Sequence, residues 1–198
     1  MLDPRAGRRD RNRRCLGGGG VSVLLVRPYR PDDRDAVLAM FDTNLPDYFG
    51  AGDREWLIET LEEPDGPAFV VTVAGEVVAF GGYEVWEHYN KALLYWGMAS
   101  RRFHGSGLGK LLLFERLLHV ARHADPPTRY VTVDTSPAIA PFFRHCGFEE
   151  TAVWPQGYRS GMTMHELRFD LSLQSIEELV ARRDAALAAA QARLGTGA

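Results

Sequence analysis

The feature that most constrains the fold is a glycine-rich segment between a strand-like run and an amphipathic helix. Residues 100–110 read Ser-Arg-Arg-Phe-His-Gly-Ser-Gly-Leu-Gly-Lys, with three glycines at alternate positions. The apolar run 92–98 precedes this segment, and Leu111, Phe114 and Leu118 follow it at helical spacing. Glycines let a backbone approach a phosphate closely, and the first amides of a helix point toward an anion. The segment therefore suits either a pyrophosphate site or a plain tight turn.

The segment fits neither of two standard nucleotide motifs. It lacks the Gly-x-x-x-x-Gly-Lys-Ser/Thr pattern of a P-loop, and no Gly-x-Gly-x-x-Gly follows the first predicted strand. Around it, strand and helix patterns alternate without an internal repeat, which predicts one α/β domain. The predicted strands are 22–27, 69–73, 77–80, 92–98, 130–134, 152–154 and 165–171, and the predicted helices are 31–41, 53–61, 110–122, 138–145 and one that begins at a Ser175/Glu178 capping box.

Length and composition exclude several classes of protein. The 198 residues, 45% of them hydrophobic, are typical of one folded domain with a tail. The apolar runs are far shorter than the roughly 18–20 residues that span a bilayer, so we expect no membrane helix and no membrane partner. Two cysteines, Cys15 and Cys146, form no disulfide framework, which favours a reducing compartment and a cytoplasmic location.

The first 20 residues differ from the rest of the chain in charge. They hold six arginines against Asp3 and Asp10, a local charge of +4 that leaves −7 on the remainder. No cleavage-type segment follows them, as it would in a signal peptide. A nucleic-acid-binding arm would need aromatic stacking residues or a folded basic face, and this segment shows neither pattern. We expect residues 1–20 to form a disordered basic tail and expect no nucleic acid partner.

Two linked motifs resemble the GNAT superfamily of acyl-CoA-dependent N-acyltransferases. Residues 104–109, His-Gly-Ser-Gly-Leu-Gly, stand where that family has its Gln/Arg-x-x-Gly-x-Gly/Ala signature. Residues 136–148, Ser-Pro-Ala-Ile-Ala-Pro-Phe-Phe-Arg-His-Cys-Gly-Phe, correspond to the family's Asn...Ala...Tyr...Gly-Phe segment. The element order agrees over residues 22–172. The resemblance implies an α/β fold with a mixed central sheet flanked by helices, in a domain at 21–172 that a C-terminal helix at 173–198 follows.

The resemblance also implies acetyl-CoA as co-substrate. In that family the strand before the loop is bulged; its backbone here, residues 96–99, would bond the pantetheine arm, and amides of residues 105–110 would hold the pyrophosphate. The thioester would lie between the strands at 92–98 and 130–134, with the amide near Met98 or Ala99 as oxyanion donor. The cofactor-binding residues so implied are Met98, Ala99, His104, Gly105, Ser106, Gly107, Leu108, Gly109, Lys110, Ser136 and Phe143.

The sequence departs from the family at side chains with chemical roles. Phe143 stands where many members have a tyrosine as general acid, and Leu93 where some have a glutamate as base. His104 replaces the Gln or Arg of the signature. Aminolysis of a thioester needs a neutral amine, a polarised carbonyl and a proton for the leaving thiolate. A base must therefore come from another position.

Glu84 is the first candidate base, because strand alternation from Phe80 aims it into the cleft. A solvated charge at a strand end is the alternative interpretation. Tyr95, which shares a strand face with Leu93, and His88 are reserve candidates. Glu84 and Tyr95 are thus the catalytic residues that we expect.

Two other groups are assigned no chemistry. Cys146 lacks an oriented histidine motif and is interpreted as a small buried apolar residue, so we reject covalent catalysis. His119 and His123 are four residues apart on one helix, as metal ligands can be. No catalytic glutamate lies between them and no third ligand is evident, so we expect no metal site.

The acceptor side is where the sequence is least specific. In the fold that the resemblance implies, the first two helices and the 154–158 loop overhang this side. We expect substrate contacts from Asn44, Tyr48, Phe49 and Tyr158, and aromatic walls suggest a small organic amine. An acidic run would attract a cationic acceptor or simply form a solvated helix face: Glu55, Glu59, Glu62, Glu63 and Asp65. Polyamine, amino acid, antibiotic and protein amines stay open.

The leading hypothesis is an acetyl-CoA-dependent N-acetyltransferase that works by direct attack within a ternary complex. Phe143 and Leu93 motivate an alternative, a catalytically silent acyl-CoA-binding regulatory module. A third reading is an interaction domain whose glycine loop is only a turn. The apolar stripe of the terminal helix packs either on its own domain or on a second subunit, so a homodimer stays open.

Overall fold

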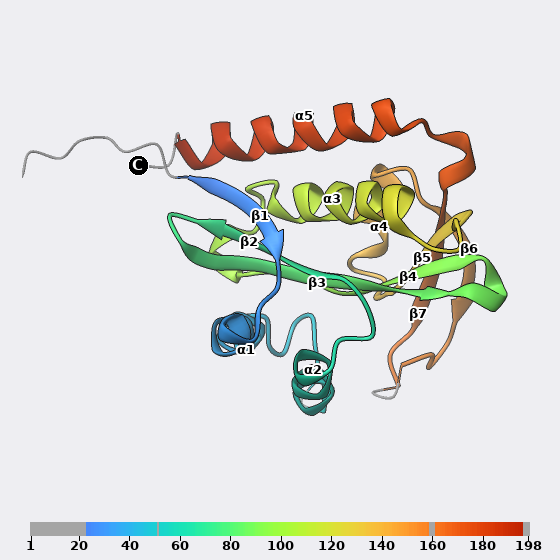
Figure 1. The fold of residues 1–198 in the computed structure, drawn as a ribbon. Coiled ribbons are helices and arrows are strands. Elements are labelled where there is room, and N and C mark those ends of the chain that lie inside the picture. Colours follow the sequence, from blue (N-terminus) through green and yellow to red (C-terminus); the bar gives the residue numbers. More distant parts are fainter. Residues whose placement is uncertain (1–22, 51, 159–160, 196–198) are drawn as a thin grey trace, which may run out of the picture.

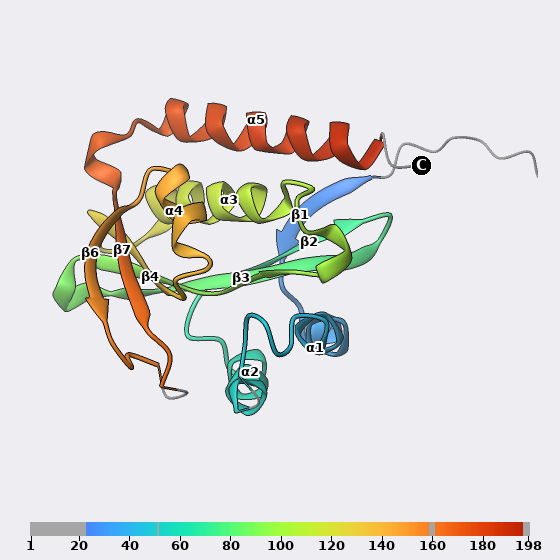
Figure 2. The ribbon, with the colours of Figure 1, turned by 180° about the vertical axis from the view of Figure 1, so that it is seen from behind.

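The protein is a mixed sheet with helices on both faces (Figures 1 and 2). The computed structural model describes residues 23–50, 52–158 and 161–195. Within them, the strand order is β1-β2-β3-β4-β5-β7-β6. The strands are β1 (Leu24–Pro28), β2 (Ala68–Val73), β3 (Glu76–Trp86), β4 (Lys91–Ala99), β5 (Tyr130–Thr135), β6 (Glu149–Trp154) and β7 (Met164–Asp170). The helices are α1 (Arg34–Asp42), α2 (Asp53–Glu62), α3 (Leu108–His123), α4 (Ala140–His145) and α5 (Ile176–Gly195).

This arrangement confirms the predicted fold class. Helices α1 and α2 lie on one face of the sheet, and α3, α4 and α5 lie on the other. No helix in the described ranges is both long enough and apolar enough to cross a membrane. The predicted basic tail at 1–20 lies outside the described residues.

The sheet is antiparallel except at its centre. β1 to β4 pair in antiparallel succession, β4 and β5 are parallel, and β7 is antiparallel to both β5 and β6. A parallel pair needs a crossover connection, which α3 provides. The β4–β5 register ends at the Leu94↔Val133 pair although both strands continue. The two strands therefore separate there, and this opening positions the candidate site.

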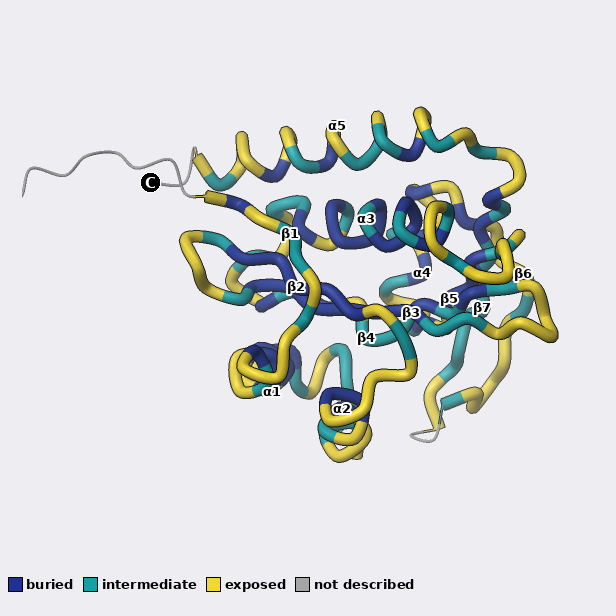
Figure 3. The backbone as a smooth tube through the Cα atoms, viewed as in Figure 1, coloured by how far each residue is buried: buried dark blue, intermediate teal, exposed yellow. Residues whose placement is uncertain are grey.

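The larger core lies between the sheet and the layer of α3 and α5. α3 is buried on most sides because α5 runs along its outer face (Figure 3). The predicted capping box starts α5: the Ser175 amide donates to Glu178 Oε2 (2.8 Å), and the Glu178 amide donates to Ser175 Oγ (3.1 Å). α5 thus packs on the domain of its own chain through three buried residues: Leu179, Ala186 and Ala190.

α1 and α2 cover only part of the opposite face. They lie beneath β2, β3 and the last residues of β4, and their helices bury mainly large aliphatic and aromatic side chains: Val37, Leu38, Met40, Phe41, Leu57 and Leu61. These pack on strand residues that include Val70, Phe80 and Met98. α1 and α2 do not cover the part of this face that β5 and β7 form, so polar side chains can lie there.

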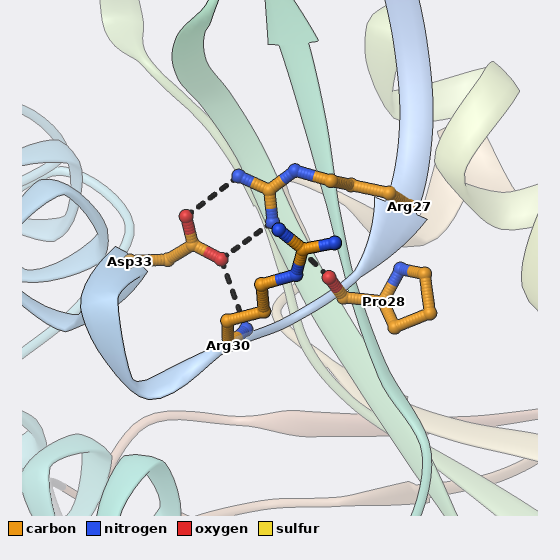
Figure 4. Close-up of polar contacts among 4 residues, drawn as sticks. All are labelled: Arg27, Pro28, Arg30 and Asp33. Carbon is orange, nitrogen blue, oxygen red and sulfur yellow. Dashed lines mark hydrogen bonds and ion pairs between the residues drawn. The ribbon is translucent and has the colours of Figure 1, made fainter.

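An ion pair fixes the entry into α1 (Figure 4). Arg27 of β1 donates from Nη1 and Nη2 to the two carboxylate oxygens of Asp33, at 2.6 and 2.7 Å. The Arg30 amide donates to Asp33 Oδ2 at 2.9 Å. The hydrogen bond from Arg27 is the first cause that lowers the pKa of Asp33 below its usual value.

β3 is longer than the sequence pattern predicts. The predicted strand stops at Phe80, whereas β3 continues through Gly81 and Gly82. A Cβ on Gly82 would lie 2.3 Å from Tyr95 Cζ, and a Cβ on Gly81 would lie 2.9 Å from Arg116 Nη1. The glycines therefore stay in the strand because side chains from neighbouring elements fill the space beside them.

Candidate active site

A bulge interrupts β4 where it leaves β5. The β3–β4 register shifts next to the Gly82↔Tyr95 pair, and Trp96 has a φ of 49°, in the left-handed region. The extra residue turns both Tyr95 and Trp96 toward α2 and the loop after it, which they reach by hydrogen bonds. Gly97 is exposed although it lies inside a strand. The backbone of β4 is therefore accessible at the bulge.

The glycine loop and the first turn of α3 form a cradle of main-chain amides. Gly105 and Gly107 have φ values of 78° and 93°, which glycine adopts without strain. A Cβ on Gly105 would meet no atom within 4 Å. The first bond inside α3 joins the Leu111 amide to Gly107 O (3.1 Å), so the amides of residues 108–110 have no acceptor within the helix. These amides and the helix dipole fit the pyrophosphate of an acyl-CoA.

The end of α5 lies against this cradle. Arg193 Nη1 is 3.4 Å from Gly105 O, and a Cβ on Gly107 would come within 3.1 Å of the same nitrogen. Lys110, half-buried in the first turn of α3, is a second cation in this region. Sequence reasoning included Lys110 but missed Arg193, which lies 88 residues beyond Gly105 in the chain.

Two predicted cofactor residues hydrogen-bond to main-chain oxygens of the loop or of the end of β4. His104 is exposed, and its Nε2 lies 3.1 Å from Ala99 O. Ser106 Oγ donates to Phe103 O at 2.5 Å. These side chains shape the loop, whereas a pyrophosphate would be held by main-chain amides.

Three other predicted cofactor residues, Met98, Leu108 and Phe143, have buried side chains. Met98 and Leu108 are 6% and 1% exposed, so only their main chains can meet a ligand. Phe143 is also buried and packs edge-to-face against Phe148. Ser136 O accepts the amides of the two residues that lead into α4. A contact between Phe143 and the cofactor stays a prediction.

Polar side chains from four neighbouring strands share the face that carries α1 and α2. One residue in each of these strands belongs to the core on the α3 side: Tyr83, Leu94, Val133 and Leu167. Alternation turns the adjacent residue to the opposite face. The residues brought together there, across β3, β4, β5 and β7, are Glu84, Tyr95, Asp134 and Glu166.

Asp134 and Glu166 form a cross-strand pair of like charge beside the β4–β5 opening. Asp134 is exposed as a residue, yet partial burial of its carboxylate is the first cause that raises its pKa. The charge of Glu166 raises this pKa further, and Lys91 opposes the shift. A carboxylate of raised pKa at an opening is a candidate general base. Sequence reasoning missed both acids, because their pairing depends on strands that are distant in the chain.

The hydroxyl of Tyr95 points across β3 toward the loop after α2. It donates to Gly66 O at 3.2 Å, while its ring covers the backbone of Gly82. Burial is the first cause that raises the pKa of Tyr95, followed by the charge of Asp65. The phenol is therefore protonated at neutral pH, as a proton donor must be.

The β6–β7 connection adds Tyr158 to this side of the sheet. The joined ends of β6 and β7 extend past the sheet on the side of α2 (Figures 1 and 2). Burial raises the pKa of Tyr158, and the charges of Asp134 and Asp53 raise it further. Tyr158 therefore lies within electrostatic range of both the end of β5 and the start of α2.

Asn44, predicted to contact the acceptor, is 2% exposed. Its Nδ2 donates to Met40 O and to Ala99 O, both at 3.0 Å. The amide therefore joins the end of α1 to the end of β4. We interpret Asn44 as a residue that supports the site from within, and its contact with an acceptor stays a prediction.

Aromatic residues line the region between α2 and the bulge. Tyr48 lies edge-on to His104, with ring centroids 5.3 Å apart, and so faces the cofactor loop. Phe49 and Trp56 lie near Trp96, with centroids 5.9 and 4.9 Å from it. Sequence reasoning proposed Tyr48 and Phe49 but missed both tryptophans. The positive φ of Trp96, which aims it at α2, leaves no mark in a periodicity pattern.

Groups that the sequence assigned no chemistry have structural partners. His119 Nδ1 lies 2.7 Å from the Tyr83 hydroxyl, and the His119 and His123 rings are 4.5 Å apart. Across the described residues, no group of three His, Cys, Asp or Glu side chains is arranged to hold a metal ion. Cys146 is fully buried, and burial raises the pKa of its thiol. His88, which the sequence offered as a reserve candidate for the base, lies in the exposed turn before β4, away from the bulge.

The sequence matches one family profile. The acetyltransferase (GNAT) family profile matches residues 37–148, more than half of the chain. This range begins within α1, ends just after α4 and includes the bulge and the cradle. A search of curated protein sequences finds no significant match.

Solved structures share the fold at low sequence identity. The ribosomal-protein-S18-alanine N-acetyltransferase from Escherichia coli has a TM-score of 0.62 at 15% identity, over 77% of this chain and 97% of that chain. A chimeric spermidine N-acetyltransferase from Vibrio cholerae has a TM-score of 0.60 at 12% identity, over 76% and 96%. An aminoglycoside 6'-N-acetyltransferase complexed with coenzyme A has a TM-score of 0.61 at 12% identity, over 74% and 97%. At these identities the similarity shows the fold alone.

Proposed function

Because this chain belongs to the acetyltransferase (GNAT) family, whose acetyl donor is acetyl-CoA, we propose that it acetylates a cationic small-molecule amine by direct attack in a ternary complex. One observation carries the proposal. The β4–β5 opening, the bulge of β4 and the cradle at the start of α3 follow one another along residues 94–110. A thioester, its pantetheine arm and its pyrophosphate need such a series of contacts in that order.

Main-chain groups would hold the cofactor. Bound acetyl-CoA supplies the activated thioester carbonyl. The amides of Gly105 and residues 108–110 would bind the pyrophosphate, and Lys110 would add charge. The exposed backbone around Gly97 would orient the pantetheine arm, and the amide near Met98 or Ala99 would donate to the carbonyl oxygen as negative charge develops there.

A carboxylate near the opening would take the proton of the acceptor amine. We place Asp134 first because its raised pKa and its position beside the opening suit a general base, with Glu84 on the same face as second candidate. The amine nitrogen bonds to the thioester carbon while the carbon–sulfur bond breaks. The amine proton passes to the carboxylate, directly or through water. The leaving thiolate takes a proton from solvent.

Charge and aromatic surface favour a cationic acceptor. The acids Glu84, Asp134 and Glu166 face the same side of the sheet, and the aromatic rings of Trp56 and Tyr158 border it. Carboxylates and aromatic faces both attract ammonium groups. Spermidine and aminoglycosides, which appear in the names of two structurally similar enzymes, carry several such groups.

Binding and turnover measurements test the proposal. We expect calorimetry to show micromolar binding of CoA and acetyl-CoA, and we expect thiol release from acetyl-CoA with spermidine or an aminoglycoside. An amino acid and a peptide with a free N-terminal alanine serve as comparison acceptors. Tight binding without turnover on any amine would favour the silent acyl-CoA-binding module. If the protein binds neither CoA nor acetyl-CoA, the proposal is overturned.

A further inference from the structure

Arg116 of α3 is buried beneath the bulge of β4. The residue is 2% exposed. Its Nη1 donates to Gly82 O (3.2 Å) and to Tyr95 O (3.3 Å), and its Nε donates to Leu112 O (3.4 Å). In the described part of the chain, its hydrogen-bond partners are all main-chain carbonyl oxygens. Burial lowers the pKa of Arg116 to about 10, so the guanidinium is charged at neutral pH.

Two glycines provide the space that this guanidinium occupies. A Cβ on Gly81 would lie 2.9 Å from Arg116 Nη1, and a Cβ on Gly97 would lie 3.0 Å from Nη2. The three atoms nearest to a Cβ on Gly97 all belong to Arg116. Glycine weakens a strand, and a buried charge without a counter-charge is costly. Both unfavourable features occur at one place, the bulge of the strand that would hold the cofactor.

The Arg116 guanidinium connects β3 and β4 at the point where the bulge interrupts their hydrogen-bond ladder. A bulge leaves one residue unpaired and bends its strand, so its local shape needs other support. Gly82 O belongs to β3 and Tyr95 O belongs to β4, and one nitrogen of Arg116 bonds both. A leucine at this position would fill the core but could bond neither carbonyl.

We propose that Arg116 is a positioning residue for acyl-CoA, which holds the β4 bulge in the shape that presents the strand backbone to the cofactor. This inference rests on the proposed function. It predicts that replacing Arg116 weakens cofactor binding as well as lowering the stability of the fold. Gly97 then has a defined role. Because it has no side chain, it leaves room for the Arg116 guanidinium beneath the exposed backbone of the bulge.

Arg116→Met and Arg116→Lys test the proposal against a matched control, Leu117→Ala, which removes buried volume from the same helix. We expect the Kd for CoA and the KM for acetyl-CoA to rise about tenfold or more in Arg116→Met, as for loss of hydrogen bonds from a charged donor. Arg116→Lys keeps the positive charge and can still donate hydrogen bonds from its single side-chain nitrogen, so it should recover part of this loss. Leu117→Ala should lower the melting temperature while its Kd for CoA stays within about twofold.

A second variant links the glycine to the arginine. Gly97→Ala should weaken CoA binding in the wild-type background and add little in Arg116→Met, because the flexible methionine can yield to the new Cβ. If the wild type binds CoA and Arg116→Met binds it within about twofold, the role of Arg116 is overturned while the proposed function stands. Equal loss of binding in Leu117→Ala and Arg116→Met would also overturn it. If the wild type itself binds no CoA, the proposed function fails.

Discussion

Gly107 and Gly109 lie two residues apart in the cradle and tolerate a side chain differently. Gly107 has a φ of 93°, and a Cβ there would approach Arg193 Nη1 to 3.1 Å. Gly109 is helical, and the nearest atom to its Cβ would be Phe142 Cζ, at 3.9 Å. A side chain would therefore strain the main chain at Gly107 but not at Gly109.

We predict that Gly107→Ala destabilises the fold by about 1–2 kcal/mol and weakens CoA binding by about tenfold, because the left-handed backbone opposes a Cβ. Gly109→Ala is the matched control. Alanine is about 1 kcal/mol better than glycine inside a helix, so this variant should be at least as stable and should keep its affinity within about threefold. Calorimetry with CoA and thermal unfolding measure both effects. Equal affinities in the two variants would contradict a cofactor role for the loop backbone.

The raised pKa of Asp134 predicts how the activity depends on pH. A base is active only when ionised, so kcat/KM should fall as the pH falls through the folded-state pKa of Asp134. Glu166→Gln removes one cause of the raised pKa, and it should move this acidic limb to lower pH. Asp134→Asn should lower kcat by roughly 100-fold or more. A Glu84→Gln variant that loses the same activity, with Asp134→Asn unaffected, would assign the role of base to Glu84 instead.

The same pKa also affects stability, with a defined sign. The folded-state pKa of Asp134 is raised, so its contribution to stability is full below the unfolded value, about 3.9, and is lost as the pH rises through the folded value. Ionised Asp134 therefore opposes folding at neutral pH. Asp134→Asn should raise the melting temperature at about pH 7 while it lowers activity, which separates a catalytic role from damage to the fold.

At the scale of elements, the Arg27–Asp33 pair joins the edge strand to the first helix (Figure 4). Asp33 also caps the turn before α1 by accepting the Arg30 amide, and its side chain is 9% exposed. Replacement by asparagine leaves the Arg27 guanidinium without its anion. We predict that Asp33→Asn destabilises the protein by about 1–3 kcal/mol at neutral pH, whereas the exposed neighbour Asp32→Asn has little effect.

This pair has the opposite pH dependence to Asp134. The pKa of Asp33 is lowered, so its contribution is full above the unfolded value, about 3.9, and is lost as the pH falls through the lower folded value. The stability difference between wild type and Asp33→Asn should therefore shrink in urea unfolding at about pH 3 and below. A difference that stays constant with pH would exclude the ion pair as its origin.

At the scale of the whole molecule, charge is divided between the two ligand sides. Lys110 and Arg193 border the cradle, which would receive an anionic cofactor, whereas Glu84, Asp134 and Glu166 face the proposed acceptor side. The formal net charge of the chain is −3. The net charge conceals this separation, which only the folded arrangement of strands creates.

We predict that attraction of the acceptor weakens with salt. The KM for a polyamine should rise several-fold between about 50 and 500 mM NaCl, because the Debye length falls from about 14 Å to about 4 Å over this range. The kcat should change little, since charges at the reacting atoms are screened less. An uncharged aromatic amine serves as the control acceptor, and its KM should not depend on salt. Equal salt dependence for both acceptors would exclude recognition by the acidic face.

The order of elements and the position of the cradle were predictable from the sequence, because they depend on short-range properties. Hydrophobic periodicity marks each helix and strand, glycines mark the loop at 105–109, and Ser175 with Glu178 marks the start of α5. Each of these signals involves residues within a few positions of one another. Residue spacing alone was enough to identify them.

Tertiary structure alone decided which polar groups meet. Asp134 faces Glu166 because β7 pairs with β5, and Arg116 reaches two carbonyl oxygens because β4 contains one extra residue opposite Gly81. Strand alternation has a period of two, so a single bulged residue changes which side chains share a face. The burial of Asn44 likewise depends on the end of β4, 55 residues away. The sequence alone therefore determined the elements and the main-chain cradle, whereas long-range pairing and one bulge decided the side chains around it.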